Sequence, residues 1–239
     1  MKKISNKNIE MLKKNSYPGR CIIIGMTPDA KNFVQIYCIM GRSENSRNRI
    51  FVEEKGEVKT KAWDESKVKD PSLIIYNVTK VFENMHIITN GDHTDTIVDY
   101  VKEGQSFEDA LNTRKFEPDE PNYTPRISGI IQMDNNKCIY KLSILKSFLN
   151  SSISCLRQYY NYESAIPGIG HCIHTYKGDG NPLPSFENEP YVVPILDNID
   201  ETLNLYWNII NEENKVSLLV KYINIETKKY QIKIINKHN

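Results

Sequence analysis

The sequence has 239 residues and nearly balanced charge, with 31 Lys and Arg against 30 Asp and Glu and a formal net charge of +1. This length suits one large domain with its own core, and the balance gives no global field that would draw the chain to nucleic acid or to a membrane surface. No apolar run approaches the roughly 18 residues of a membrane span, and the basic N-terminus lacks a signal peptide's apolar region. We therefore expect a cytoplasmic protein without membrane or nucleic-acid partners.

Residues 1–16 are polar and rich in Lys and Asn, so we expect an N-terminal extension that forms a loose helix or no regular structure. A single domain is expected over 17–239, since no repeat, low-complexity tract or linker-like change of composition interrupts it. Turn and strand signals in its first part predict, in order, a turn at 17–20, strands at 21–24 and 33–40, and a hairpin of 50–52 with 58–63.

The middle of the chain predicts two further strands, 72–77 and 85–89. The first would end in the polar pair Tyr76-Asn77. The second would end at Asn90-Gly91, because this pair tolerates positive φ and breaks a strand. The two polar strand ends would therefore lie side by side.

Helices are predicted after this turn, where Gly104 stops an amphipathic pattern, and from Ser106, which forms a capping box with Asp109. The strongest helical pattern is 200–211, with apolar residues at i, i+3, i+4 and i+7. Many hairpins and few helices predict an α+β fold of antiparallel sheets covered by helices. The remaining predicted strands are 127–133 with 138–145 around a turn at 134–136, then 153–160, 168–176, and a hairpin of 216–225 with 230–235.

The turn after Thr89 concentrates polar side chains: Asn90, Asp92, His93, Thr94 and Asp95. Free backbone N–H groups at a helix start favour anions. Asp and Thr are equally the residues of an ordinary N-cap, so the turn alone leaves an anion site and a plain helix cap both open.

The spacing of histidines and cysteines along the chain gives little support for a metal site or for thiol chemistry. In a strand, His171 and His174 would point to opposite faces, which suits neither an HExxH helix nor a zinc knuckle. There is no P-loop and no GxGxxG, so we expect no ATP or dinucleotide cofactor and no metal. An odd cysteine count without CxxC predicts reduced thiols at Cys21, Cys38, Cys138, Cys155 and Cys172.

Arginines recur on predicted loops beside strand ends, which is notable in a neutral protein. The planar guanidinium fork matches phosphate oxygens, and amides and hydroxyls accompany it. The pattern predicts a pocket for a small phosphorylated, amide-rich ligand, with solvated loops and surface ion pairs of little energetic worth as the alternative. The arginines are Arg20, Arg42, Arg47, Arg49 and Arg126.

A set of short motifs makes the pattern specific. In chain order they are Gly19-Arg20, Gly41-Arg42-Ser43 with Asn48-Arg49, Tyr76-Asn77, the block from Thr89 to Asp95, Thr124-Pro125-Arg126-Ile127 and His174-Thr175-Tyr176. The set resembles the archaeal-type IMP cyclohydrolase family over roughly 17–195. The blocks around His93 and Arg126 are the most distinctive.

The resemblance implies a four-layer αββα sandwich similar to the N-terminal-nucleophile hydrolases, without autoprocessing. It implies IMP cyclohydrolase activity, in which 5-formamidoimidazole-4-carboxamide ribonucleotide closes to IMP with loss of water and without a cofactor. The partner would be this small purine nucleotide, and a homo-oligomer is left open.

The chemistry assigns candidate roles. A carboxamide nitrogen is a poor nucleophile that must be positioned and relieved of a proton, and the formyl oxygen becomes an oxyanion that leaves as water. Tyr76 is the candidate proton donor or oxyanion partner, and Glu117 the candidate base or amide-orienting group. The candidate substrate-binding residues are Arg20, Arg42, Arg47, Asn48, Arg49, Asn77, Asn90, Gly91, His93, Thr94, Arg126, His174 and Tyr176.

One position departs from the family pattern. Familiar members often carry an arginine in the second strand, where this chain has Cys38 in the segment 37–41. Its role would either be vacant or fall to a neighbour such as Arg47. The departure keeps two alternatives open: a non-catalytic purine-nucleotide binder on the same scaffold, and a hydrolase of another cyclic amide.

Overall fold

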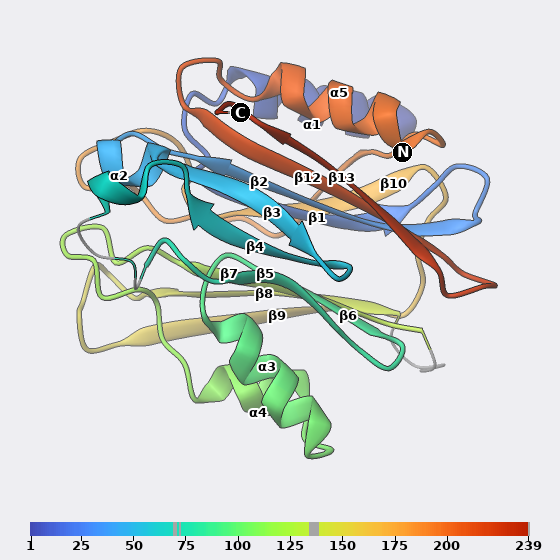
Figure 1. Cartoon of the computed structure of the whole chain (residues 1–239), viewed down its shortest axis with the longest axis horizontal. Helices are drawn as coiled ribbons and strands as arrows, with labels where there is room; N and C mark the ends of the chain where they lie inside the picture. Colours follow the sequence, from blue (N-terminus) through green and yellow to red (C-terminus); the bar gives the residue numbers. More distant parts are fainter. Residues whose placement is uncertain (69–70, 72, 134–138, 239) are drawn as a thin grey trace.

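The computed structural model describes residues 1–68, 71, 73–133 and 139–238, which form two antiparallel sheets stacked face to face (Figure 1). The first sheet has the strand order β11-β10-β1-β2-β12-β13. Its strands are β1 (Arg20–Met26), β2 (Asn32–Met40), β10 (Ile169–His174), β11 (Tyr191–Pro194), β12 (Lys215–Asn224) and β13 (Tyr230–Asn236).

The second sheet follows the order of the chain, β3-β4-β5-β6-β7-β8-β9, so each strand pairs with its neighbour in sequence. This order fits the hairpin-rich sequence, because antiparallel neighbours need only short connections. Its strands are β3 (Arg49–Glu54), β4 (Glu57–Ala62), β5 (Asn77–Phe82), β6 (Met85–Thr89), β7 (Arg126–Gln132), β8 (Tyr140–Ser147) and β9 (Cys155–Tyr162).

Helices cover the outer faces of both sheets (Figure 1). Helices α1 (Lys2–Lys14) and α5 (Ile199–Ile209) pack on the first sheet, and α3 (His93–Lys102) and α4 (Phe107–Asn112) pack on the second. Helix α2 (Glu44–Arg47) and a 3₁₀ turn (Glu65–Lys67) lie in connections. The 1–16 segment thus forms a helix whose Ile9 and Leu12 are buried against the first sheet.

Alternation along the strands separates the cores. On β1, Ile22 and Ile24 point into the core between the sheets, whereas Cys21 and Ile23 point to the helices. Such strands bury both faces, which explains why β1 reads as a continuous apolar run. The expected α+β fold with antiparallel sheets is confirmed.

The predicted hairpins and the helices after Asn90, after Ser106 and at 200–211 are confirmed, with ends shifted by a few residues. Gly104 ends α3 with φ of +77°, and Ser106 makes the capping box with Asp109. Strand β11 and helix α2 were not predicted. The turn predicted at 134–136, and Cys138 at the start of one predicted strand, lie outside the described residues.

The predicted strand at 72–77 is wrong. The backbone amides of Ile74 and Ile75 both bond to the Pro71 carbonyl, so this apolar run is a turn, and the strand begins only at Asn77. Because β5 runs antiparallel to β6, the start of β5 lies beside the end of β6. Tyr76 therefore still comes close to the turn at Asn90, although it precedes a strand instead of ending one.

The expectation that all thiols are reduced is also wrong, because Cys21 and Cys38 form a disulfide. The two residues lie directly opposite each other on β1 and β2, with their Cα atoms 5.2 Å apart, a separation that suits a disulfide. Cysteine count and spacing cannot reveal such a strand register. Cys155 and Cys172 are free.

Within the described residues, none of the helices combines the length and apolar content that crossing a bilayer requires.

Candidate functional site

Three of the predicted arginines open strands: Arg20 begins β1, Arg49 begins β3 and Arg126 begins β7. Tyr76 directly precedes β5, and Glu117 lies in the loop between α4 and β7. All five side chains are buried. We call them the arginine site, since electrostatic interactions link Glu117 to all three arginines and Tyr76 to Arg20 and Arg49.

Glu117 is the anionic centre of the arginine site. Its Oε2 lies 3.8 Å from Nη2 of Arg20, and it is 2% exposed. Burial raises the pKa of Glu117, while Arg20 and Arg126 oppose that rise. Burial alone would lower the pKa of Arg20, but Glu117 and neighbouring tyrosines raise it instead. A carboxyl with a raised pKa beside a fixed cation is a typical arrangement for proton transfer near neutral pH.

The hydroxyl of Tyr76 is paired with a second tyrosine. Its oxygen lies 2.8 Å from the hydroxyl oxygen of Tyr37, and both rings are buried in the core between the sheets. Burial raises the pKa of Tyr37, and the Tyr76 hydroxyl raises it further, whereas Arg20 lowers it. Tyr37 was not predicted as a site residue, and its only sequence signal was a phenol hydroxyl in the mainly apolar strand β2.

Arg49 is fully buried and incompletely bonded. Its Nε donates to the Ser46 carbonyl at 2.9 Å, but neither Nη1 nor Nη2 has a hydrogen-bond partner among the described residues. Nε of Arg20 and Nε of Arg126 are buried and unpaired in the same sense. Burial and the nearby Arg20 lower the pKa of Arg49. Unpaired buried guanidinium groups are costly, so their clustering favours an anionic ligand.

Arg126 organises the turn after β6. Its Nη1 lies 2.6 Å from Oδ1 of Asp92 and 3.1 Å from Nδ1 of His93. Arginine can only donate, so Nδ1 of His93 accepts and its Nε2–H donates to Oγ of Ser128 at 3.0 Å. Burial and Arg126 lower the pKa of His93. A Cβ on Gly91 would lie 2.6 Å from Nη1 of Arg126, so glycine is required for this close approach.

Four predicted binding residues make hydrogen bonds to neighbouring segments of the chain, three of them to backbone groups and Asn77 to a side chain. Asn48 exchanges bonds with the Asp64 backbone, and Asn90 bridges Pro125 and Ile127. The other two are Thr94, which donates to the Asn77 carbonyl at 2.5 Å, and Asn77, whose amide donates to Asp95. They position the arginine site, and direct ligand contacts by them stay a prediction.

Three further candidates lie apart from the arginine site. Arg42 is exposed and pairs with Asp179 and the Gly180 carbonyl, and Arg47 is exposed and bonds to the Gly41 carbonyl. The suggestion that Arg47 replaces an arginine at the Cys38 position finds no support in this placement.

His174 faces the helices, as Cys172 does two residues earlier on β10, whereas Ile173 faces the other sheet.

His171 and His174 do point to opposite faces, as their spacing predicts. Nδ1 of His171 lies 2.6 Å from the Tyr140 hydroxyl in the core between the sheets, while His174 lines a cavity at the end of α1. Tyr176 reaches the edge of the arginine site, where its hydroxyl lies 2.5 Å from Oγ1 of Thr124. The backbone N–H of Glu117 donates to the Thr124 carbonyl at 2.8 Å.

Residues 17–229 match the family model described as IMP cyclohydrolase-like protein. The chain belongs to this family. The family match covers both sheets apart from β13, and it includes every residue of the arginine site.

Relatives of the family share about half of the chain. A Methanococcus maripaludis protein named IMP cyclohydrolase is 35% identical over 123 residues, which are 49% of this chain and 59% of that protein. Namesakes from Methanosphaera stadtmanae and Haloarcula marismortui are 32% and 30% identical, covering 48% and 49% of this chain and 57% and 56% of theirs. The chain thus matches less than two thirds of the length of these relatives.

Proposed function

We propose that this protein is an IMP cyclohydrolase, which closes 5-formamidoimidazole-4-carboxamide ribonucleotide to IMP with loss of water, the last step of de novo purine biosynthesis. We further propose that it works in the cytoplasm and that its stacked sheets are a variant of the N-terminal-nucleophile hydrolase sandwich without autoprocessing. Family membership and the names of its relatives support the activity. The domain extent of 17–239 and a homo-oligomeric state stay predictions.

The cluster of three buried guanidinium groups with unpaired N–H donors carries the proposal. A nucleotide phosphate brings nearly two negative charges at neutral pH, and fixed donors in a dry site bind such an anion strongly. Because Arg49 has both terminal nitrogens unpaired among the described residues, we assign the phosphate to Arg49. Arg20 and Arg126, which both interact electrostatically with Glu117, then act on the base and ribose.

Ring closure needs a base for the carboxamide N–H and an acid for the departing oxygen. Glu117 suits the first role, since burial raises its pKa and Arg20 fixes its carboxylate. The Tyr76 hydroxyl can donate to the oxygen that becomes an oxyanion and leaves as water, with Tyr37 holding it at 2.8 Å. Both groups act only if the reacting atoms are held between them.

We expect the purified chain to close the formamido nucleotide in an absorbance assay without ATP and after exhaustive chelation. The expectation follows from the missing nucleotide-binding motifs and from His171 and His174 facing opposite ways. Loss of activity with EDTA and recovery with zinc would contradict it. Tight IMP binding without any turnover would instead support a non-catalytic purine-nucleotide binder. Turnover of other cyclic amides alone would support a hydrolase of another cyclic amide.

We expect Arg49→Met to raise KM and weaken IMP binding by roughly tenfold to a hundredfold, the scale of one charge-assisted contact. The fold should tolerate the change, because it removes a buried charge and costs only the hydrogen bond to the Ser46 carbonyl. Arg42→Met is the matched control, since Arg42 is exposed and bonded to Asp179, and its effect should be much smaller. Isothermal titration with IMP measures the affinity of both variants, and steady-state kinetics measures their KM. Equal affinity in wild type and Arg49→Met would remove Arg49 from the site.

A further inference from the structure

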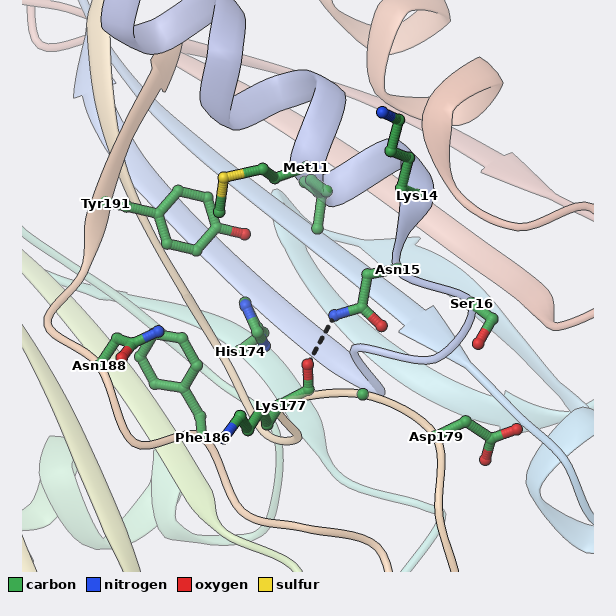
Figure 2. A pocket seen from close by; sticks show the side chains of 12 residues that line it. Met11, Lys14, Asn15, Ser16, His174, Lys177, Asp179, Phe186, Asn188 and Tyr191 are labelled. Carbon is green, nitrogen blue, oxygen red and sulfur yellow. Dashed lines mark hydrogen bonds between the residues drawn. The ribbon is translucent and has the colours of Figure 1, made fainter.

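A cavity lies on the far side of the first sheet from the arginine site. It has a volume of about 430 Å³ and lies between the end of α1 and the segment 177–191 (Figure 2). This volume is within the range of sites for small organic ligands. The proposed reaction makes no use of it.

His174 forms the floor of this cavity. Its ring lies between Phe186 and Tyr191, with ring centroids 4.3 Å and 5.7 Å from theirs, and it is 4% exposed. Figure 2 shows one imidazole nitrogen directed into the space between Met11, Tyr191 and Asn15. The cavity therefore has aromatic walls and a buried polar group at its base.

The hydrogen bonding of His174 fixes which nitrogen can receive a ligand. Nδ1 lies 2.7 Å from the Tyr176 carbonyl, which can only accept, so Nδ1 carries the proton. Burial lowers the pKa of His174 to about 4, although the bond to Tyr176 opposes this. The ring is thus neutral at pH 7, and Nε2 presents a lone pair that has no partner in the described part of the chain.

In the described part of the chain the rim of the cavity carries two lysines, of which only the exposed Lys14 lacks an ion pair. Lys177 pairs with Glu187 at 3.3 Å, and Asp179 pairs with Arg42. The amide of Asn188 on the rim offers both a donor and an acceptor (Figure 2). This composition contrasts with the arginine site and suits an uncharged ligand with several hydrogen-bonding groups.

We propose that this cavity binds an uncharged nitrogen heterocycle of the nucleobase or nucleoside class, which donates a ring N–H to Nε2 of His174 and packs on Phe186 and Tyr191. A flat ring satisfies both the aromatic walls and the single acceptor on the floor. The site is independent of the proposed reaction, because it lies on the other face of the sheet.

The test is isothermal titration of the full chain with hypoxanthine, adenine, inosine and adenosine, each with saturating IMP present. The two bases and the two nucleosides separate a bare heterocycle from one that carries ribose. We expect one equivalent of at least one ligand to bind. His174→Phe should weaken binding at least about tenfold, since it leaves the ligand N–H without an acceptor. Arg49→Met, which disables the arginine site, should leave this binding unchanged.

Met11→Trp gives a second variant that does not disturb the core, because Met11 is 53% exposed at the cavity mouth. The indole should fill the space and block binding, whereas Ile4→Trp, on the same helix and equally exposed at 56%, should not. Affinities weaker than about 1 mM for all four ligands, wild-type affinity in Met11→Trp, or equal loss in both tryptophan variants would overturn the proposal. Loss in Arg49→Met would show that this binding depends on the arginine site and overturn the proposal as well.

Discussion

Tyr76→Phe should lower kcat of ring closure on the order of 10²-fold and change KM little. The loss matches the removal of one general acid or one oxyanion donor, and a contact that strengthens only in the transition state appears in kcat and not in KM. Steady-state kinetics with the formamido nucleotide measures it. The stability of the variant must be measured beside the rate, since the Tyr76 hydroxyl also bonds to Tyr37.

Tyr37→Phe is the matched control for this loss. Both variants break the same 2.8 Å hydrogen bond between buried hydroxyls, so each should cost about 1–3 kcal/mol of unfolding free energy. Only Tyr76→Phe removes the hydroxyl assigned to the reacting oxygen, so Tyr37→Phe should retain kcat within about tenfold. Equal kcat in the two variants, with equally lowered thermal midpoints, would show that the pair only stabilises the core.

The sequence indicated the arginine site because its residues sit at local signals. Asn90-Gly91 marks the break after β6, and Gly91 is also the position where Arg126 approaches too closely for a side chain. Arg20, Arg49 and Arg126 adjoin predicted strands, so their placement at strand starts followed from short-range patterns. Even the wrong strand at 72–77 left Tyr76 near the right place, because β5 and β6 pair antiparallel.

What could not be predicted depends on pairing between distant segments. The Cys21–Cys38 disulfide needs the register of β1 against β2, and Tyr37 meets Tyr76 across the two sheets. His174 belongs to the same short motif as Tyr176, which reaches the edge of the arginine site. Because side chains alternate along the strand, His174 nevertheless faces the helices. Neither composition nor spacing along the chain contains this three-dimensional information.

One buried polar group has no part in either site. Lys221 lies in β12 and faces the second sheet, as Leu219 and Ile223 on the same strand do, and it is 0% exposed. Its Nζ lies 4.2 Å from the centre of the Tyr230 ring and has no hydrogen-bond partner among the residues described. Oε1 of Gln35, opposite Lys221 in the strand register, is also unpaired.

Burial lowers the pKa of Lys221 to about 7, although the carboxylates of Glu57 and Glu53 oppose the shift. His86, with an unpaired and buried Nδ1, is a further titratable group nearby, and burial with Lys221 lowers its pKa to about 3. In the unfolded chain the lysine keeps its ordinary pKa near 10.5. Between pH 7 and 10.5 the unfolded state therefore binds more protons, so stability should rise with pH across this window.

Lys221→Met should consequently stabilise the protein most at or below pH 7, where the folded state must hold the charged amine. At roughly 1.4 kcal/mol for each pH unit between the two pKa values, the gain is several kcal/mol, and it should shrink as pH rises towards 10.5. Denaturant unfolding of wild type and variant at pH 6, 8 and 10 measures the difference. Lys215→Met, on the same strand, should instead lose stability at each pH, because Lys215 pairs with Glu212 at 2.5 Å and lies over Trp207. If Lys221→Met did not differ in stability from wild type at pH 6, or differed by the same amount from pH 6 to 10, the pKa of the buried amine would not be lowered in the folded state.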